Sequence, residues 1–195
     1  MRKMWIAATL AIAVVVLGAA PAAHARGFYV GGSLGQTSAD MGFGSSTPGI
    51  SVDDSDTGFK LLGGYNIVKY FAVEGSWVDV AGISMEASDP LLGTMSASAE
   101  ADGFAFEAVG ILPIGKRFQL FADYGMYMWD GTTTVSASDP LIPSFSASDD
   151  GSDPTYGLGF GWSVIERGTL RFEAERYEIE TMDVDMYSVG FTYSF

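Results

Sequence analysis

One short stretch decides how this chain folds: Tyr156-Gly157-Leu158-Gly159-Phe160-Gly161-Trp162. Every second residue in it is large and apolar, and every residue between these is a glycine. Successive side chains of a β-strand point to opposite faces of the sheet. The stretch therefore predicts a strand with one bulky apolar face and one bare face.

Further segments share this period of two. The eight predicted strands cover residues 27–36, 57–65, 70–80, 103–112, 118–129, 155–164, 169–178 and 185–195. Gly, Ser, Thr and isolated charges occupy one face. The other face is apolar and carries Phe59, Leu61, Tyr65, Val73, Trp77, Phe104, Phe106, Leu112, Leu120, Tyr124, Met126, Met128, Tyr156, Leu158, Phe160, Trp162, Leu170, Phe172, Tyr187, Val189, Phe191, Tyr193 and Phe195.

The links between the predicted strands alternate in length. Those at 37–56, 81–102 and 130–154 are long, polar and acidic, with a brief link near 179–184 on the same side. Those at 66–69, 113–117 and 165–168 read as tight turns, with turn residues Asn66, Pro113, Gly115 and Gly168. Long loops at one end and short turns at the other are typical of a transmembrane β-barrel.

The N-terminus predicts export. Arg2 and Lys3 precede an apolar run at 6–19, and residues 23–25 have the small-x-small pattern of a cleavage site. This layout predicts a cleaved secretory signal peptide at 1–25 and a barrel domain at 26–195. An uncleaved N-terminal anchor is the alternative reading.

Composition excludes several classes of function. Two of the ten basic residues lie in the signal peptide, so residues 26–195 carry eight basic against 24 acidic residues, a formal net charge of −16. Such a chain does not bind nucleic acid through its phosphates. Without Cys, and with its single His24 lost with the signal, it lacks the groups for Ser-His hydrolysis, thiol chemistry and ordinary zinc sites. We predict no enzyme, no cofactor and no metal, although a carboxylate-only mechanism at Glu107 and Asp123 remains conceivable.

Volume decides which face of the strands points outward. A soluble eight-stranded barrel of the lipocalin kind would turn the apolar face inward. However, eight strands enclose a space that side chains just fill, and about two dozen bulky groups would overfill it. The apolar face must then meet lipid, where closure of the barrel satisfies every backbone polar group. The sequence predicts an all-β, eight-stranded, antiparallel, up-and-down transmembrane barrel with short periplasmic turns and longer acidic extracellular loops.

Several segments, in this order, resemble the OmpA-type family of small outer-membrane β-barrels, which includes OmpX-like members. Residues 58–65 and 71–74 look like its second and third strands, 109–113 with 117–121 like its central hairpin, and 170–177 like its seventh strand. The resemblance implies the outer membrane of a Gram-negative bacterium, surrounding lipids and a monomer. Nothing follows Phe195 in the sequence, so we expect this chain to lack the C-terminal peptidoglycan-binding domain of larger family members. The ending resembles the signal read by the barrel-assembly machinery, carried by Tyr187, Phe191, Tyr193 and Phe195.

The polar face predicts a charge network in the lumen, made of Lys60, Glu74, Glu107, Asp123, Arg171, Glu173 and Glu175. Turn lengths place Lys60 beside Glu74 as an ion pair. They also place Glu107 close to Asp123, a carboxylate pair that needs a cation or a proton. Glycines are predicted to face the charges of the seventh strand, with Gly161, Gly159 and Gly157 opposite Arg171, Glu173 and Glu175, and Gly190 near Arg171.

Two functional readings follow from this lumen. In the first, Arg171 reaches across to Glu107 and Asp123, because a guanidinium can bridge carboxylates. The network then plugs a structural barrel that meets an unknown external partner through its loops. In the second, five acidic and two basic residues line a narrow cation-selective or water pore. The small enclosed volume favours the plug.

The long links contain an internal repeat. Ala87-Ser88-Asp89-Pro90-Leu91 with residues 96–98 recurs as Ala137-Ser138-Asp139-Pro140-Leu141 with residues 146–148. We expect both copies to extend hairpins above the membrane, with Asp-Pro at the turns. The loop surface then either binds a partner or only solubilises the protein. The acidic clusters at 53–56 and 149–153 lack the spacing of a calcium loop and predict solvated surface. Phe28, Trp77, Trp129 and Trp162 are expected near the membrane interfaces.

Overall fold

The computed structural model describes residues 27–40, 50–53, 55–80, 83–89, 93–137, 144–179 and 182–195. The predicted signal peptide lies outside these residues, so it stays a prediction. Within the described part of the chain, no helix is long and apolar enough to span a membrane.

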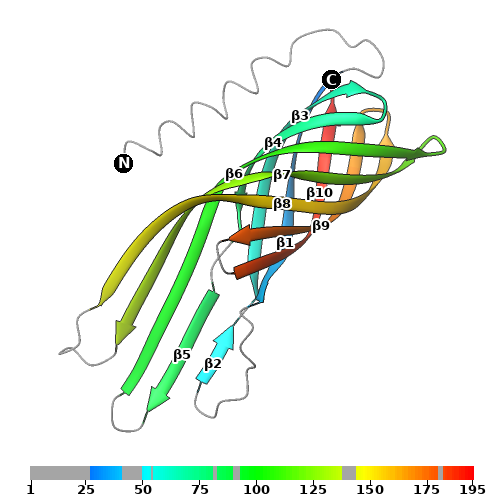
Figure 1. Ribbon diagram of the computed structural model, residues 1–195. Helices are drawn as coiled ribbons and strands as arrows, with labels where there is room; N and C mark the ends of the chain where they lie inside the picture. The colour runs from blue at the N-terminus through cyan, green and yellow to red at the C-terminus, as the bar shows by residue number, and fades with distance from the viewer. Residues whose placement is uncertain are drawn as a thin grey trace.

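A strand is present at each of the eight predicted positions. Their bounds are β1 (Gly27–Asp40), β3 (Ser55–Val68), β4 (Phe71–Asp79), β6 (Gly93–Ile114), β7 (Phe118–Ala137), β8 (Phe145–Ile165), β9 (Gly168–Ile179) and β10 (Met182–Ser194). Antiparallel pairing links them in the order β6-β4-β3-β1-β10-β9-β8-β7, and a further pairing of β6 with β7 closes the ring (Figure 1). The predicted eight-stranded antiparallel barrel is confirmed.

Three strands continue well past the barrel. β6, β7 and β8 contain 22, 20 and 21 residues, whereas a membrane-crossing strand needs about 9–11. Two shorter strands extend the same sheet, because β5 (Ile83–Asp89) pairs with β6 and β2 (Ile50–Asp53) pairs with β5. Figure 1 shows these strands projecting together from one end of the barrel. The links at 81–102 and 130–154, predicted as long and polar, consist largely of paired strands, because small residues such as Ser, Ala and Thr alternate there and pair with the neighbouring segment.

The internal repeat forms two hairpin extensions, as predicted. The first hairpin, β5–β6, is paired as far as Asp89↔Gly93. The second, β7–β8, is paired as far as Val135↔Phe145. Its Asp139-Pro140 step lies outside the described residues.

The outer face of the barrel is the predicted apolar face. None of the bulky side chains assigned to it is buried, and Leu158 and Tyr124 are 69% and 63% exposed. Aromatic rings on neighbouring strands pack along this face, such as Phe118 and Phe160 with centroids 5.6 Å apart. A surface so apolar is stable only against lipid.

The inner face contains more apolar side chains than the sequence pattern predicts. A loop-end cluster consists of Val78, Val80, Ala105, Tyr127, Trp129, Tyr177, Ile179, Val184 and Met186. A turn-end cluster consists of Tyr29, Leu62, Ala72, Val109 and Phe121, with Ile111 packed against it. The interface position predicted for Trp129 is wrong, because Met128 faces outward and its neighbour must face inward. The Trp129 indole N–H donates to Asp153 at 2.7 Å.

The short turns are tighter than predicted. In the β3–β4 hairpin the last pair is Val68↔Phe71, so Asn66 lies within a strand and residues 69–70 form the turn. Of the predicted turn residues, only Gly115 lies in a turn, where its φ of 68° is readily adopted by glycine. Pro113 is the last but one residue of β6, and Gly168 begins β9.

Candidate functional site

The lumen holds a layer of charged side chains between the two apolar clusters. All seven predicted network residues are buried there, each no more than 7% exposed. They come from β3, β4, β6, β7 and β9, and alternation along each strand turns them inward. Five carboxylates and two cationic groups share this layer, and they divide into two groups.

The first group centres on Arg171. Its Nη1 donates to Glu74 Oε1 at 2.8 Å, and its Nη2 donates to Glu173 Oε1. The Tyr29 hydroxyl also donates to Glu74 Oε1, at 2.6 Å. The guanidinium carbon lies 4.4 Å from the centroid of the Phe121 ring, an arrangement suited to cation–π attraction. Arg171 thus ties β9 to β4 and packs on β7.

The predicted reach of Arg171 to Glu107 and Asp123 is wrong, and Phe121 gives the reason. This ring lies over Gly159, where an added Cβ would be 2.1 Å from Phe121 Cζ. The guanidinium stacks on this ring and pairs with Glu173 on its own strand and with Glu74 across the lumen. The predicted glycine partners of Arg171 are nevertheless correct, since Gly161 and Gly190 lie opposite it.

The second group centres on Lys60. Its Nζ lies 2.5 Å from Glu175 Oε1 and 3.6 Å from Glu107 Oε2. The predicted pair with Glu74 is wrong because the tight β3–β4 turn sets a different register. Lys60 is opposite Val78, and Glu74 is opposite Gly64. Lys60 therefore takes the bridging position that the sequence suggested for Arg171.

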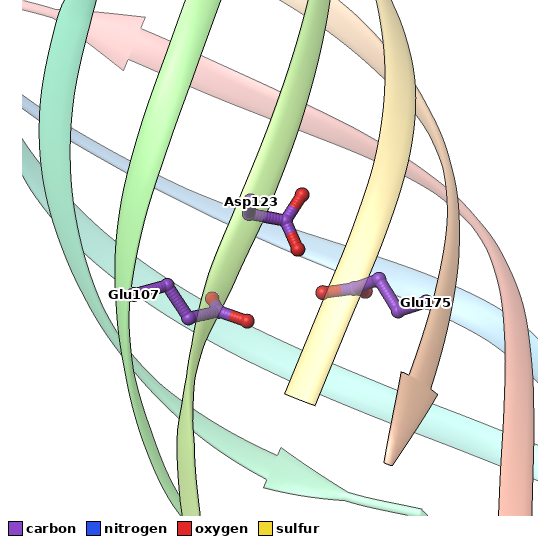
Figure 2. Close-up of side chains that lie close together, drawn as sticks. All are labelled: Glu107, Asp123 and Glu175. Atoms are coloured by element: carbon purple, nitrogen blue, oxygen red, sulfur yellow. The ribbon is translucent and has the colours of Figure 1, made fainter. Parts of the chain in front are cut away.

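Three carboxylates converge beside Lys60 and form the carboxylate cluster of Glu107, Asp123 and Glu175. One oxygen from each lies within 4.8 Å of the other two. Figure 2 shows the three side chains pointing toward one another from β6, β7 and β9. The closeness of Glu107 and Asp123 is as predicted. Glu175 was predicted to lie in the lumen but not beside this pair. The pairing of Gly157 could have shown it, because Gly157 pairs with Asp123 on one side and with Glu175 on the other.

Glycines make this approach of carboxylates possible. A Cβ at Gly157 would lie 2.7 Å from Asp123 Oδ1 and 2.9 Å from Glu175 Cγ. A Cβ at Gly125 would lie 2.8 Å from Glu107 Cγ. Side chains at either position would therefore push the carboxylates apart.

Several oxygens of the cluster lack a hydrogen-bond partner within the described structure. These are both oxygens of Asp123, both oxygens of Glu107 and Oε2 of Glu175, although Glu107 Oε2 faces Lys60 across 3.6 Å. Buried charges are stable only when they are paired, hydrated or bound to a cation. Among the described residues, this is also the one group of three metal-ligating side chains close enough to share an ion.

The predicted assembly-signal residues lie on the outer face. Tyr187, Phe191 and Tyr193 are exposed, and Phe195 follows β10 with its ring 5.4 Å from that of Tyr193. This position leaves them accessible from the lipid side. Their reading by assembly machinery stays a prediction.

A closed barrel with a lipid-facing apolar exterior and buried charged side chains in its lumen defines a small integral β-barrel of the outer membrane. A family model described as the outer membrane protein beta-barrel domain matches residues 7–195, and the chain belongs to this family. The protein accordingly lies in the outer membrane of a Gram-negative bacterium, surrounded by its lipids.

Solved structures show the same fold. The attachment invasion locus protein Ail of Yersinia pestis is 18% identical, with a TM-score of 0.56 over 87% of this chain and 99% of Ail. OprG from Pseudomonas aeruginosa is 18% identical, with a TM-score of 0.56 over 88% of this chain and 97% of OprG. The N-terminal barrel of OprF from the same species is 11% identical, with a TM-score of 0.55 over 88% of this chain and all of that domain. No curated protein matches the sequence.

Proposed function

We propose that this protein is a plugged outer-membrane scaffold that presents its extended acidic hairpins to a partner outside the cell. One observation carries the proposal: the lumen is filled by side chains while β6, β7 and β8 continue beyond the barrel. The proposal contains no catalytic step.

The plug consists of three successive layers. The turn-end cluster lies nearest the short turns, the charged layer follows, and the loop-end cluster, with Tyr127 and Trp129, lies beyond it. An eight-stranded barrel has an interior that side chains just fill. Two apolar layers offer water no hydrogen bonds, so we expect no continuous aqueous path.

The hairpin surface has an anionic character that limits the choice of partner. β6, β7 and β8 carry exposed acidic side chains at Glu100, Asp102, Asp130, Asp149 and Asp150. The structural relative Ail has been solved with sucrose octasulfate, a heparin analogue and thus a polyanion. An acidic surface repels such a ligand, so we propose a partner with a cationic surface for this chain.

Assembly and oligomeric state belong to the same proposal. We expect the barrel-assembly machinery to recognise the aromatic end of β10, and the closed barrel to remain a monomer. Closure leaves none of its eight strands unpaired along the barrel, which removes the usual route of edge-to-edge association.

One observation favours a narrow cation or water pore as the second candidate. The charged layer is acidic overall, and carboxylate oxygens in it lack partners among the described residues. A cation passing along the lumen would be attracted to this layer. The apolar clusters on both sides oppose this function.

Planar-bilayer conductance of the mature chain, residues 26–195, tests the two candidates. We expect the wild type to be silent. A Phe121→Ala/Arg171→Ala/Tyr127→Ala variant is expected to conduct, because it removes a bulky side chain from each of the three layers. Arg176→Ala, on an exposed ion pair with Asp185, serves as the control and should stay silent. A steady cation-selective current from the wild type would contradict the plug and support the pore.

A further inference from the structure

The carboxylate cluster carries more negative charge than its protein neighbours balance. Glu107, Asp123 and Glu175 contribute three carboxylates, and Lys60 is the cation in contact with them among the described residues. Arg171 is engaged with Glu74 and Glu173. With all three carboxylates ionised, the cluster keeps a residual charge of −2. This is the charge that a divalent cation neutralises.

Asp123 supplies an independent indication of a ligand. Its residue is 7% exposed, and neither carboxylate oxygen has a hydrogen-bond partner within the described structure. In Figure 2 its carboxyl group lies together with those of Glu107 and Glu175 inside the barrel. An ionised carboxylate buried without a partner is strongly unfavourable, so a ligand between the three groups accounts for its position.

The barrel wall leaves room at this point. Gly157 sits opposite Asp123 on β7 and opposite Glu175 on β9. Its missing Cβ would come within 2.7 Å of Asp123 Oδ1. Glycine at this position thus preserves the space in which the carboxylates face one another.

The donor set limits the choice of ion. Carboxylate oxygens are hard ligands that suit Ca²⁺, Mg²⁺ or Mn²⁺. The three carboxylates offer oxygens that all lie within 4.8 Å of one another, so a single ion can contact all of them. Ca²⁺ accepts irregular sets of oxygen ligands, whereas Mg²⁺ demands near-ideal octahedral geometry and keeps several waters, so three carboxylates fixed to a barrel wall suit Ca²⁺ better.

We propose that Glu107, Asp123 and Glu175 bind one Ca²⁺ ion inside the barrel, with Lys60 balancing the remaining carboxylate charge. The ion joins β6, β7 and β9 across the lumen and completes the charged layer. This site departs from the sequence-based expectation of no metal. It is separate from the acidic residues of the hairpins, which are exposed.

The test uses the full chain, expressed in a Gram-negative host and extracted from its outer membrane into detergent. Bound calcium is measured by elemental analysis after extraction with Ca²⁺ and removal of free ion. The guanidinium midpoint of unfolding is measured with Ca²⁺ and with a chelator. We expect one Ca²⁺ per wild-type barrel and a lower midpoint in chelator. Tb³⁺ should occupy the same site and show luminescence sensitised by buried tyrosines such as Tyr177.

Three variants locate the ion. Asp123→Asn removes one ligand charge with little change of shape, and we expect binding to weaken at least about tenfold. Gly157→Ala keeps every charge and fills the space beside Asp123, so it should also lose the ion. The control, Asp149→Asn/Asp150→Asn, changes exposed hairpin residues and should retain one Ca²⁺.

Each contrary result overturns the proposal. A wild-type barrel without bound calcium and with the same midpoint in chelator would mean that protons, not a metal, balance the cluster. Calcium retained by Asp123→Asn, or lost in the hairpin control, would place the ion elsewhere. If neither lumen variant assembles, the wild-type calcium content and chelator response decide alone. None of these measurements depends on whether the hairpins bind a partner.

Discussion

Arg171 connects three strands across the lumen. It contacts carboxylates on β4 and β9, and its guanidinium packs on Phe121 of β7. Lysine could not replace it, because an ammonium lacks both the planar fork and the flat face that stacks on a ring. The side chain therefore combines charge balance with packing, and its loss affects both.

We predict that Arg171→Ala destabilises the folded barrel by about 3–5 kcal/mol, because it leaves Glu74 and Glu173 buried without their cation. Unfolding in urea, followed in lipid vesicles, measures the loss. Arg176→Ala is the matched control. Its guanidinium pairs with Asp185 at 2.6 Å on a side chain that is 38% exposed, so we expect stability close to that of the wild type. Equal losses in the two variants would refute the network.

At the scale of the strand, the alternating glycines of β8 leave room in the lumen for side chains of the adjoining strands. Gly157, Gly159 and Gly161 place no side chain on this part of the barrel wall. Side chains of the adjoining strands then occupy the space, as the Phe121 ring does over Gly159. A glycine row thus determines where neighbouring side chains lie.

We expect Gly159→Ala to destabilise the barrel by about 1–3 kcal/mol, because the new methyl group overlaps the Phe121 ring. Gly110→Ala is the control, since its Cβ would face outward and come no closer than 3.8 Å to any atom. That change should be neutral or stabilise by up to about 1 kcal/mol. The guanidinium chloride concentration at the midpoint of unfolding is measured for both variants. An unchanged midpoint for Gly159→Ala would show that the Phe121 ring is free to move.

The same scale explains what sequence reasoning could reach. Alternation predicts which face a residue occupies, and this placed all seven network residues in the lumen. Contacts across the lumen depend on register, and register depends on the turn. The predicted length of the β8–β9 turn gave the correct register, and so the glycine partner Gly161 of Arg171. The β3–β4 turn is tighter than predicted, and the changed register moves Lys60 away from Glu74.

Two further features were predicted only in part. The ring of Phe121 was not assigned to the lumen, although it follows the outward-facing Leu120 and alternation alone would have placed it there. The internal repeat predicted the β6 extension as a hairpin, but not its strand bounds, because small residues such as Ser and Ala give only a weak alternation there. Pairing between neighbouring chain segments in water, rather than burial in lipid, forms that part of the sheet.

For the whole molecule, the barrel and its extended sheet are separable parts. The barrel is held by lipid contact outside and by the three lumen layers inside. The extension rests on strand pairing, such as Thr132↔Ser148 in the β7–β8 hairpin. The proposed surface function and the stability of the barrel in the membrane would therefore reside in different segments.

We predict that replacing residues 133–147 by an Asn-Gly turn leaves a barrel that assembles and unfolds at the denaturant midpoint of the wild type. The cut removes the β7–β8 pairs beyond Thr132↔Ser148 and the β6–β7 pairs from Ala99↔Thr133 to Met95↔Ala137, all in the extended sheet, and Asn-Gly suits a two-residue hairpin. In the full-length chain, Asp149→Asn/Asp150→Asn removes two exposed acidic residues, so binding of intact cells to beads that carry a cationic peptide should fall. The shortened hairpin keeps both of these residues and is the control. Undiminished binding would mean that this hairpin is not the contact surface.

The seam between β1 and β10 has a consequence for how the molecule comes into being. Its pairs join opposite ends of the described chain, from Tyr29↔Ser194 to Asp40↔Asp183. Contacts so distant in sequence form slowly, since the entropy of the intervening chain must be overcome first. Until they form, both terminal strands expose a row of unsatisfied backbone groups that hydrocarbon does not tolerate. Ring closure and entry into the bilayer are therefore one coupled event.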